Sequence, residues 1–101
     1  MMWQFWERSG PVPLAGAVRL VLERERGVSI AGAAGLRMIA QGGHDADRPV
    51  TYFHVFDPAA IAETDGEPGS YDDLDARLIL HSGYIDRDGT VVLNGPIRPS
   101  R

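Results

Sequence analysis

The pattern of apolar and polar residues centres on one stretch, residues 50–57, which read Val-Thr-Tyr-Phe-His-Val-Phe-Asp. β-Branched and aromatic side chains dominate this stretch, and Pro49 and Pro58 bound it, so we predict a β-strand. Successive side chains of a strand point to opposite faces. One face therefore carries Val50, Tyr52, His54 and Phe56, and the other carries Thr51, Phe53 and Val55. Both faces are largely apolar, which is typical of a strand inside a sheet with further material packed on each side.

A second periodic stretch lies upstream, over residues 13–26. Its apolar positions follow the spacing of one helix face, namely Leu14, Ala17, Val18, Val21 and Leu22. Pro13 suits the first turn of a helix, and Gly27 suits the left-handed position after the last turn. We therefore predict an amphipathic helix that packs one face on the sheet.

The region between these two elements is ambiguous. Residues 28–35 read as a short strand that runs into a glycine turn, as in a dinucleotide-binding fingerprint, but Met38 occupies the position of the third glycine. Residues 36–41 suit either a short helix or a strand. We favour a strand that pairs with 50–57 in a hairpin across residues 42–48, because this gives the central strand a neighbour without a long connection.

After the central strand, Asp57 is placed to cap one helical turn at residues 58–62. Residues 63–75 form an acidic connection that contains carboxylates at 63, 65, 67, 72, 73 and 75 and no positive charge. We interpret this connection as a solvated loop.

Residues 76–85 predict a second long strand, with Leu78, Leu80 and Tyr84 on one face and Ile79, His81 and Ile85 on the other. A type I turn follows at residues 86–90, with Gly89 in the left-handed position, and residues 90–94 return as a third strand. Residues 95–101 are a polar, proline-containing stretch that we expect to be a flexible tail.

These elements predict a single α+β domain over residues 1–101, in which one N-terminal amphipathic helix packs on a three- or four-stranded antiparallel sheet. Residues 1–12 form an aromatic N-terminal segment with Trp3, Phe5 and Trp6. Such large apolar side chains need cover, on the chain's own core, on a partner or at a membrane interface. Docking on the chain's own core is the interpretation we favour.

Composition removes several function classes. The chain has no cysteine, and all ten of its positive side chains are arginine, so disulfides, thiolate nucleophiles, cysteine zinc sites and lysine Schiff bases are excluded. The net charge is −4, and the acidic residues concentrate after residue 55, which argues against nucleic-acid binding. The chain has neither a long apolar run nor a leader pattern, so we expect a soluble, cytoplasmic protein that does not bind membranes.

Candidate chemistry is limited to three histidines. His54 and His81 fall on different predicted strands, and in a suitable register they could share a face and form a metal pair completed by Asp57 or by the loop that holds His44 and Asp47. These are weak metal candidates, and we predict no metal and no cofactor. Ser82 is adjacent to His81 in sequence, but neighbours on a strand point to opposite faces, so we expect no catalytic dyad from these two residues.

The sequence favours a small non-catalytic binding or assembly protein that forms a homo-oligomer or binds a protein partner. The residues expected at its interaction surface are Trp3, Phe5, Trp6, Tyr52, Phe53 and Phe56. The alternative is a small enzyme, or a ligand- or metal-binding protein, with a pocket around His54 and His81.

Overall fold

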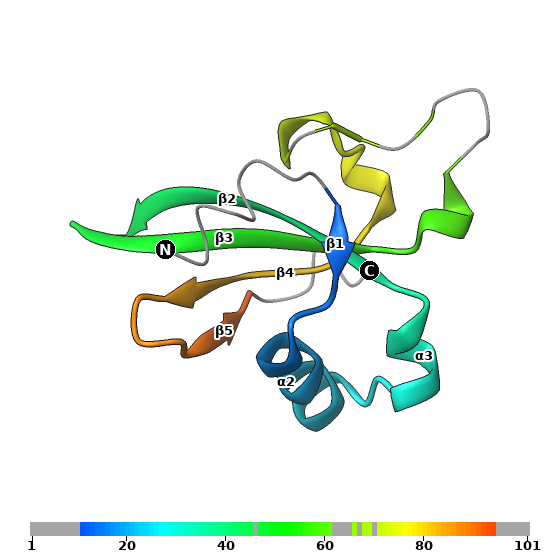
Figure 1. Cartoon of the computed structure of the whole chain (residues 1–101), viewed down its shortest axis with the longest axis horizontal. Coiled ribbons are helices and arrows are strands. Elements are labelled where there is room, and N and C mark those ends of the chain that lie inside the picture. Colours follow the sequence, from blue (N-terminus) through cyan, green and yellow to red (C-terminus); the bar gives the residue numbers. More distant parts are fainter. Residues whose placement is uncertain (1–10, 46, 62–65, 67, 70, 95–101) are drawn as a thin grey trace, which may run out of the picture.

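The computed structural model describes residues 11–45, 47–61, 66, 68–69 and 71–94. Over these residues the fold is α+β, with one five-stranded antiparallel sheet and two α-helices (Figure 1). The strands are β1 (Val12–Pro13), β2 (Arg37–Asp45), β3 (Arg48–Phe56), β4 (Ile79–Asp86) and β5 (Val91–Leu93), and they lie side by side in chain order. The predicted count of three or four strands is wrong, because β1 pairs at the sheet edge over only two residues, one of them a proline, too few to give a strand pattern.

The central position of β3 agrees with its two apolar faces. β2 pairs with β3 from Arg37 opposite Phe56 to Asp45 opposite Arg48, so the predicted hairpin is confirmed and residues 36–41 are not helical. The connection is shorter than predicted, because β2 continues to Asp45 and the chain reverses beside Asp47, which has a φ of 74°. Both glycines of the expected loop therefore lie within the sheet.

Helix α2 (Gly16–Arg26) covers one face of the sheet. Its buried residues Val18, Val21 and Leu22 belong to an apolar cluster that includes Phe53 and Val55 of β3. The helix begins later than the predicted Pro13, because that residue belongs to β1, and it ends at Gly27, which has the expected left-handed φ of 69°. Within the described part of the chain, neither helix has the length and apolar character needed to cross a membrane.

Residues 30–34 form a second helix, α3 (Ile30–Ala34), where a strand and glycine turn were predicted. The Ser29 hydroxyl oxygen accepts a hydrogen bond from the Gly32 amide at 2.9 Å and caps the helix start. The helix preference of the serine cap and of the alanine-rich stretch after it outweighs the strand preference of the β-branched Val28 and Ile30. The strand that a dinucleotide fingerprint requires is therefore not formed.

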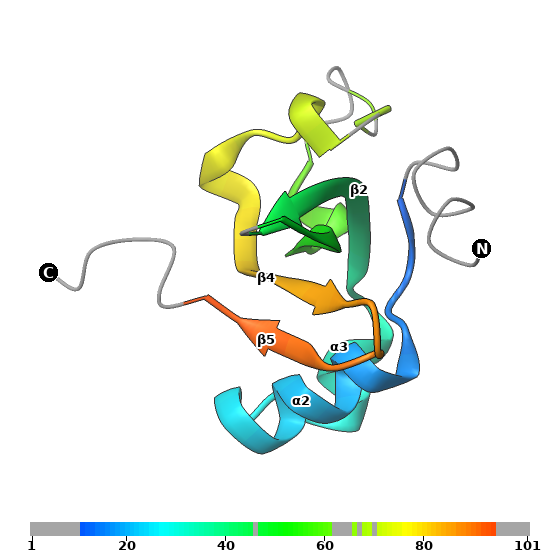
Figure 2. The ribbon, with the colours of Figure 1, turned by 90° about the vertical axis from the view of Figure 1, so that its left-hand side faces the viewer.

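The other face of the sheet carries a second, smaller apolar cluster, formed by Ile39, Phe56, Leu74 and Ile79. Three 3₁₀ turns cover it, η1 (Pro58–Ala60), η2 (Tyr71–Asp73) and η3 (Ala76–Leu78). Figures 1 and 2 show these turns and the two helices on opposite sides of the sheet. The Asp57 carboxylate accepts from the Ala59 amide at 3.0 Å, which confirms the predicted cap.

The start and the faces of β4 differ from the prediction. Ala76–Leu78 forms η3 rather than strand, because the Asp75 carboxylate accepts from the Arg77 amide and caps a turn there. The register between β3 and β4 shifts between Val55 and Phe56. This irregularity turns Ile79 to the cluster of Phe56, opposite the face that holds Ile85, so the predicted grouping of these two residues is wrong.

The hairpin from β4 to β5 agrees with the prediction. Gly89 has a φ of 92°, and its amide donates to the Asp86 carbonyl at 2.9 Å. Of the predicted aromatic segment only residues 11 and 12 are described, and the predicted tail, residues 95–101, lies outside the described residues. The predicted acidic loop is described only in part.

Candidate functional site

Of the residues predicted at an interaction surface, two are buried, one is partly exposed, and three lie outside the described residues. Phe53 and Phe56 are both 0% exposed, Phe53 beneath α2 and Phe56 beneath the 3₁₀ turns. Their assignment to a surface is wrong, because the chain itself covers both faces of β3 at these positions. Trp3, Phe5 and Trp6 lie outside the described residues. Tyr52 remains partly exposed on the face opposite α2.

Tyr52 belongs to a row of side chains that crosses four strands on this face. Gln41 of β2 lies opposite Tyr52 of β3, Tyr52 lies opposite Tyr84 of β4, and Tyr84 lies opposite Val92 of β5. The two tyrosine rings meet edge to face, with centroids 6.3 Å apart and an interplanar angle of 73°. Gln41 is exposed, Val92 is 37% exposed, and both tyrosines are half-buried. We call these four residues the tyrosine row.

The position of Tyr52 is set by close contacts with β2. Its hydroxyl donates a hydrogen bond to the His44 carbonyl at 2.7 Å. Its ring lies so close to Gly43 that a Cβ at this position would be 2.6 Å from the ring carbon Cε2. Glycine at position 43 is therefore required for the ring to lie against the sheet, and the hydrogen bond holds it there.

Beside the tyrosine row, His54 joins the sheet to the turn η2. Its imidazole stacks on the Tyr71 ring with centroids 4.1 Å apart, and its Nδ1 shares a hydrogen bond with the hydroxyl of Ser82, its partner across the strands. A histidine beside a serine is the arrangement of a base and a nucleophile. Here, however, Ser82 is only 4% exposed, so its hydroxyl is not accessible to a substrate and serves to orient the histidine. Sequence inspection missed this pair because it depends on the register of β3 and β4.

The two histidines predicted to share a pocket lie on opposite faces of the sheet. His54 is opposite Ser82, whereas His81 is opposite Val55, whose side chain faces α2. Burial, and secondly the charge of Arg26, lower the pKa of His81. Its Nδ1 atom is buried and has no hydrogen-bond partner in the described part of the chain.

The weak metal candidates are not brought together. His44 lies opposite Pro49 near the hairpin turn that holds Asp47, apart from the strand positions of His54 and His81. Among the residues that the structure describes, no three histidine or carboxylate side chains are grouped so that they could hold a metal ion.

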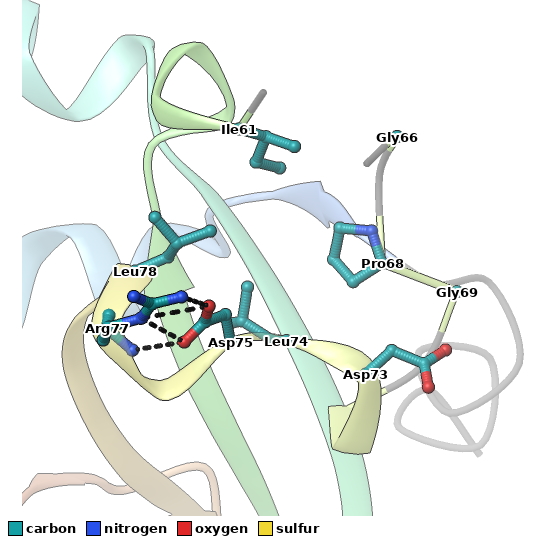
Figure 3. Close-up of a pocket in the computed structure, with 9 residues that line it drawn as sticks. All are labelled: Ile61, Gly66, Pro68, Gly69, Asp73, Leu74, Asp75, Arg77 and Leu78. Atoms are coloured by element: carbon teal, nitrogen blue, oxygen red, sulfur yellow. Dashed lines mark hydrogen bonds and ion pairs between the residues drawn. The ribbon is translucent and has the colours of Figure 1, made fainter. Parts of the chain in front are cut away.

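A cleft of about 530 Å³ lies among the 3₁₀ turns (Figure 3). Its lining residues are Ile61, Gly66, Pro68, Gly69, Asp73, Leu74, Asp75, Arg77 and Leu78. Asp75 and Arg77 form an ion pair at 2.8 Å, and hydrogen bonds from the side chain and amide of Arg77 lower the pKa of Asp75 to about 2. None of the predicted site residues that the structure describes lines this cleft, because the sequence between 63 and 75 reads as a solvated loop.

Similarity to known proteins gives no guide to function. Comparison with protein-family models, curated proteins and solved structures found no significant match. The tyrosine row and the cleft are therefore the two features of the described part of this protein that bear on its function.

Proposed function

We propose that this protein is a small non-catalytic assembly protein that pairs with a second copy of itself through the tyrosine row. The observation that carries the proposal is the row itself, in which two partly exposed tyrosines lie side by side between Gln41 and Val92. Tyrosine is enriched at protein interfaces because its ring offers a large apolar area and its hydroxyl a hydrogen bond. A two-fold dimer is the commonest arrangement of identical chains.

The surroundings of the row support this proposal. On one side of the row Val50 and Asp86 are opposite each other, and Arg48 forms an ion pair with Asp86 at 3.2 Å. On the other side the His54 ring is stacked on Tyr71. An aromatic centre between polar margins resembles the core and rim of a protein interface.

The proposal is tested by light scattering coupled to gel filtration. We expect the wild-type chain, at 11.0 kDa, to elute with twice this mass at micromolar concentrations. Tyr84→Ser should weaken pairing by roughly 30-fold, because interface tyrosines commonly contribute about 2 kcal/mol. Leu20→Ser is the matched control, since Leu20 is 62% exposed on α2, on the opposite side of the sheet.

Two results would contradict the proposal. One is a wild-type chain that stays at the mass of a single copy over tens of micromolar. The other is a Tyr84→Ser variant that keeps its circular dichroism spectrum and associates as tightly as the wild type.

The cleft favours a second candidate function, the binding of a small molecule. Its volume of about 530 Å³ falls within the range of ligand pockets, roughly 300–1,000 Å³. Leu74 and Leu78 supply apolar contacts, and the pair of Asp75 and Arg77 supplies polar ones. A fragment screen monitored by the methyl resonances of the two leucines tests this function. Fragments that shift only the resonances of the tyrosine row would count against it.

A further inference from the structure

The residues that follow β5 have the composition of a ligand for an aromatic surface. Residues 95–101 read Gly-Pro-Ile-Arg-Pro-Ser-Arg, with Pro96 and Pro99 at the spacing Pro-x-x-Pro. Proline fixes its own φ near −65° and biases the preceding residue toward extended conformations, so such a sequence favours the polyproline II helix. Segments of this kind bind aromatic-lined surfaces, because their extended conformation needs little ordering on binding.

The tyrosine row offers the contacts that such a segment uses. The rings of Tyr52 and Tyr84 present apolar surface against which proline rings can pack. A polyproline II helix has no internal hydrogen bonds, so its carbonyl groups remain available as acceptors. The exposed side-chain amide of Gln41 on β2 and the hydroxyl of Tyr84 on β4 are donors on the same face, two strands apart.

The dimensions of the segment and of the row agree. Neighbouring strands are about 4.8 Å apart, so Val92 and Tyr52, two strands from each other, are separated by about 10 Å along the row. A polyproline II helix rises about 3.1 Å per residue, so Pro96 and Pro99 are about 9 Å apart. The two prolines can therefore span the part of the row that runs from β5 to β3.

Charge also favours this pairing. Residues 95–101 contain Arg98 and Arg101 and no acidic residue, whereas residues 55–94 contain nine acidic residues and two arginines. Opposite charges on the segment and on the body of the protein increase the rate of encounter and fix the orientation of binding.

The direction of β5 favours a second copy, rather than the same chain's own row, as the partner of this segment. The Asn94 amide donates to the Ser82 carbonyl at 2.8 Å, so the chain continues past Val92 in the direction away from the row. A return to its own row would need a reversal at Gly95 and Pro96, and a proline placed in that turn could not also contact the tyrosines. Binding to a second copy needs no reversal.

Resting on the proposed function, we propose that the tyrosine row of each copy binds residues 95–101 of its partner as a polyproline II segment. In a two-fold dimer the exchange is reciprocal, so two rows and two segments are used. This identifies the occupant of the row as a specific part of this same chain.

The first test uses the full chain with Pro96→Ala and Pro99→Ala together. Light scattering should show at least about tenfold weaker self-association, comparable with the loss of an interface anchor. Pro13→Ala is the matched control, because it makes the same chemical change at an exposed position of β1, at the edge of the sheet. Circular dichroism spectra verify that all variants fold alike.

The second test measures binding of the segment directly. A fluorescein-labelled peptide of residues 94–101 is titrated with the Pro96→Ala/Pro99→Ala protein, whose rows are free of the native segment. We expect saturable anisotropy that weakens as salt is raised, and the further change Tyr84→Ser should abolish it.

The outcomes separate this inference from the proposed function. If Tyr84→Ser weakens self-association but the double proline variant associates like the wild type, the row pairs two copies and the inference about its occupant is overturned. If the wild type is a single copy and the peptide does not bind, both are overturned. If the peptide binds equally well to the Tyr84→Ser protein, the segment binds elsewhere and the inference fails.

Discussion

Gly83→Ala is the substitution for which the structure gives the most specific expectation. Gly83 is buried on β4, opposite Leu93 of β5. A Cβ added there would be 2.1 Å from the Val92 carbonyl oxygen and 3.0 Å from the Leu93 Cα, whereas ordinary contacts begin at 3.4 Å. Both opposing groups are backbone, so no side-chain rotation relieves the overlap. Strand β5 would have to move by more than about 1 Å.

The cost follows from what β5 contributes to the fold. Overpacking of this kind costs about 1–3 kcal/mol, and the displacement also exposes Val91, whose full burial contributes about 2 kcal/mol. Val91 belongs to the apolar cluster beneath α2. We therefore expect Gly83→Ala to lower the free energy of unfolding by about 3 kcal/mol or more, a large part of the 5–15 kcal/mol of a typical domain.

Urea unfolding followed by circular dichroism measures this change, with Gly35→Ala as the matched control. Gly35 has a φ of −90°, and an added Cβ would have nothing within 4 Å, so alanine there should change stability by less than about 1 kcal/mol. Because Val92 belongs to the tyrosine row, Gly83→Ala should also weaken self-association. A Gly83→Ala protein as stable as the Gly35→Ala protein would refute the close approach of β4 and β5.

Three further predictions concern the row, a buried histidine and the cleft. The Cβ added by Gly43→Ala would overlap the ring of Tyr52 rather than backbone, and a side chain can move away. The substitution should therefore lower the free energy of unfolding by only about 1 kcal/mol, the value of the lost tyrosine hydrogen bond. Light scattering should nevertheless show weaker self-association, because the ring leaves its place in the row. Burial lowers the pKa of His81, so the unfolded chain takes up the proton more readily, and the free energy of unfolding should fall as pH drops below about 6.5. His81→Leu should remove that component of the pH dependence in urea titrations. In a carbon-detected NMR titration the Asp75 carboxyl should have a midpoint near 2, and Arg77→Ala should raise it toward 3.8.

Several elements of this fold are determined by local sequence. The dense β-branched and aromatic residues of β3, the apolar stripe of α2, and Gly89 in the turn before β5 each specify their structure within a few residues. The alternation along β3 also assigns Tyr52 and Phe53 correctly to opposite faces. Ser29 is a residue type that commonly caps helices and could have predicted α3, but the neighbouring β-branched residues favoured a strand.

The candidate sites depend on contacts between residues far apart in the sequence. Alternation assigns Phe56 to a face but does not tell whether that face is covered, and the 3₁₀ turns that bury it come from a stretch that reads as a solvated loop. The tyrosine row exists only because Tyr52 and Tyr84 are opposite each other in the register of β3 and β4. The same register pairs His54 with Ser82 and separates it from His81.

Local pattern thus determined β3, α2 and the turn before β5, and which side chains share a face of β3. The tertiary structure alone decided which residues meet across strands and which face remains open. The physical reason is that local propensity depends on a residue and its neighbours in the chain, whereas the register between strands is selected by the packing of whole faces. A one-residue irregularity, such as that between Val55 and Phe56, turns every residue beyond it to the other face of the sheet.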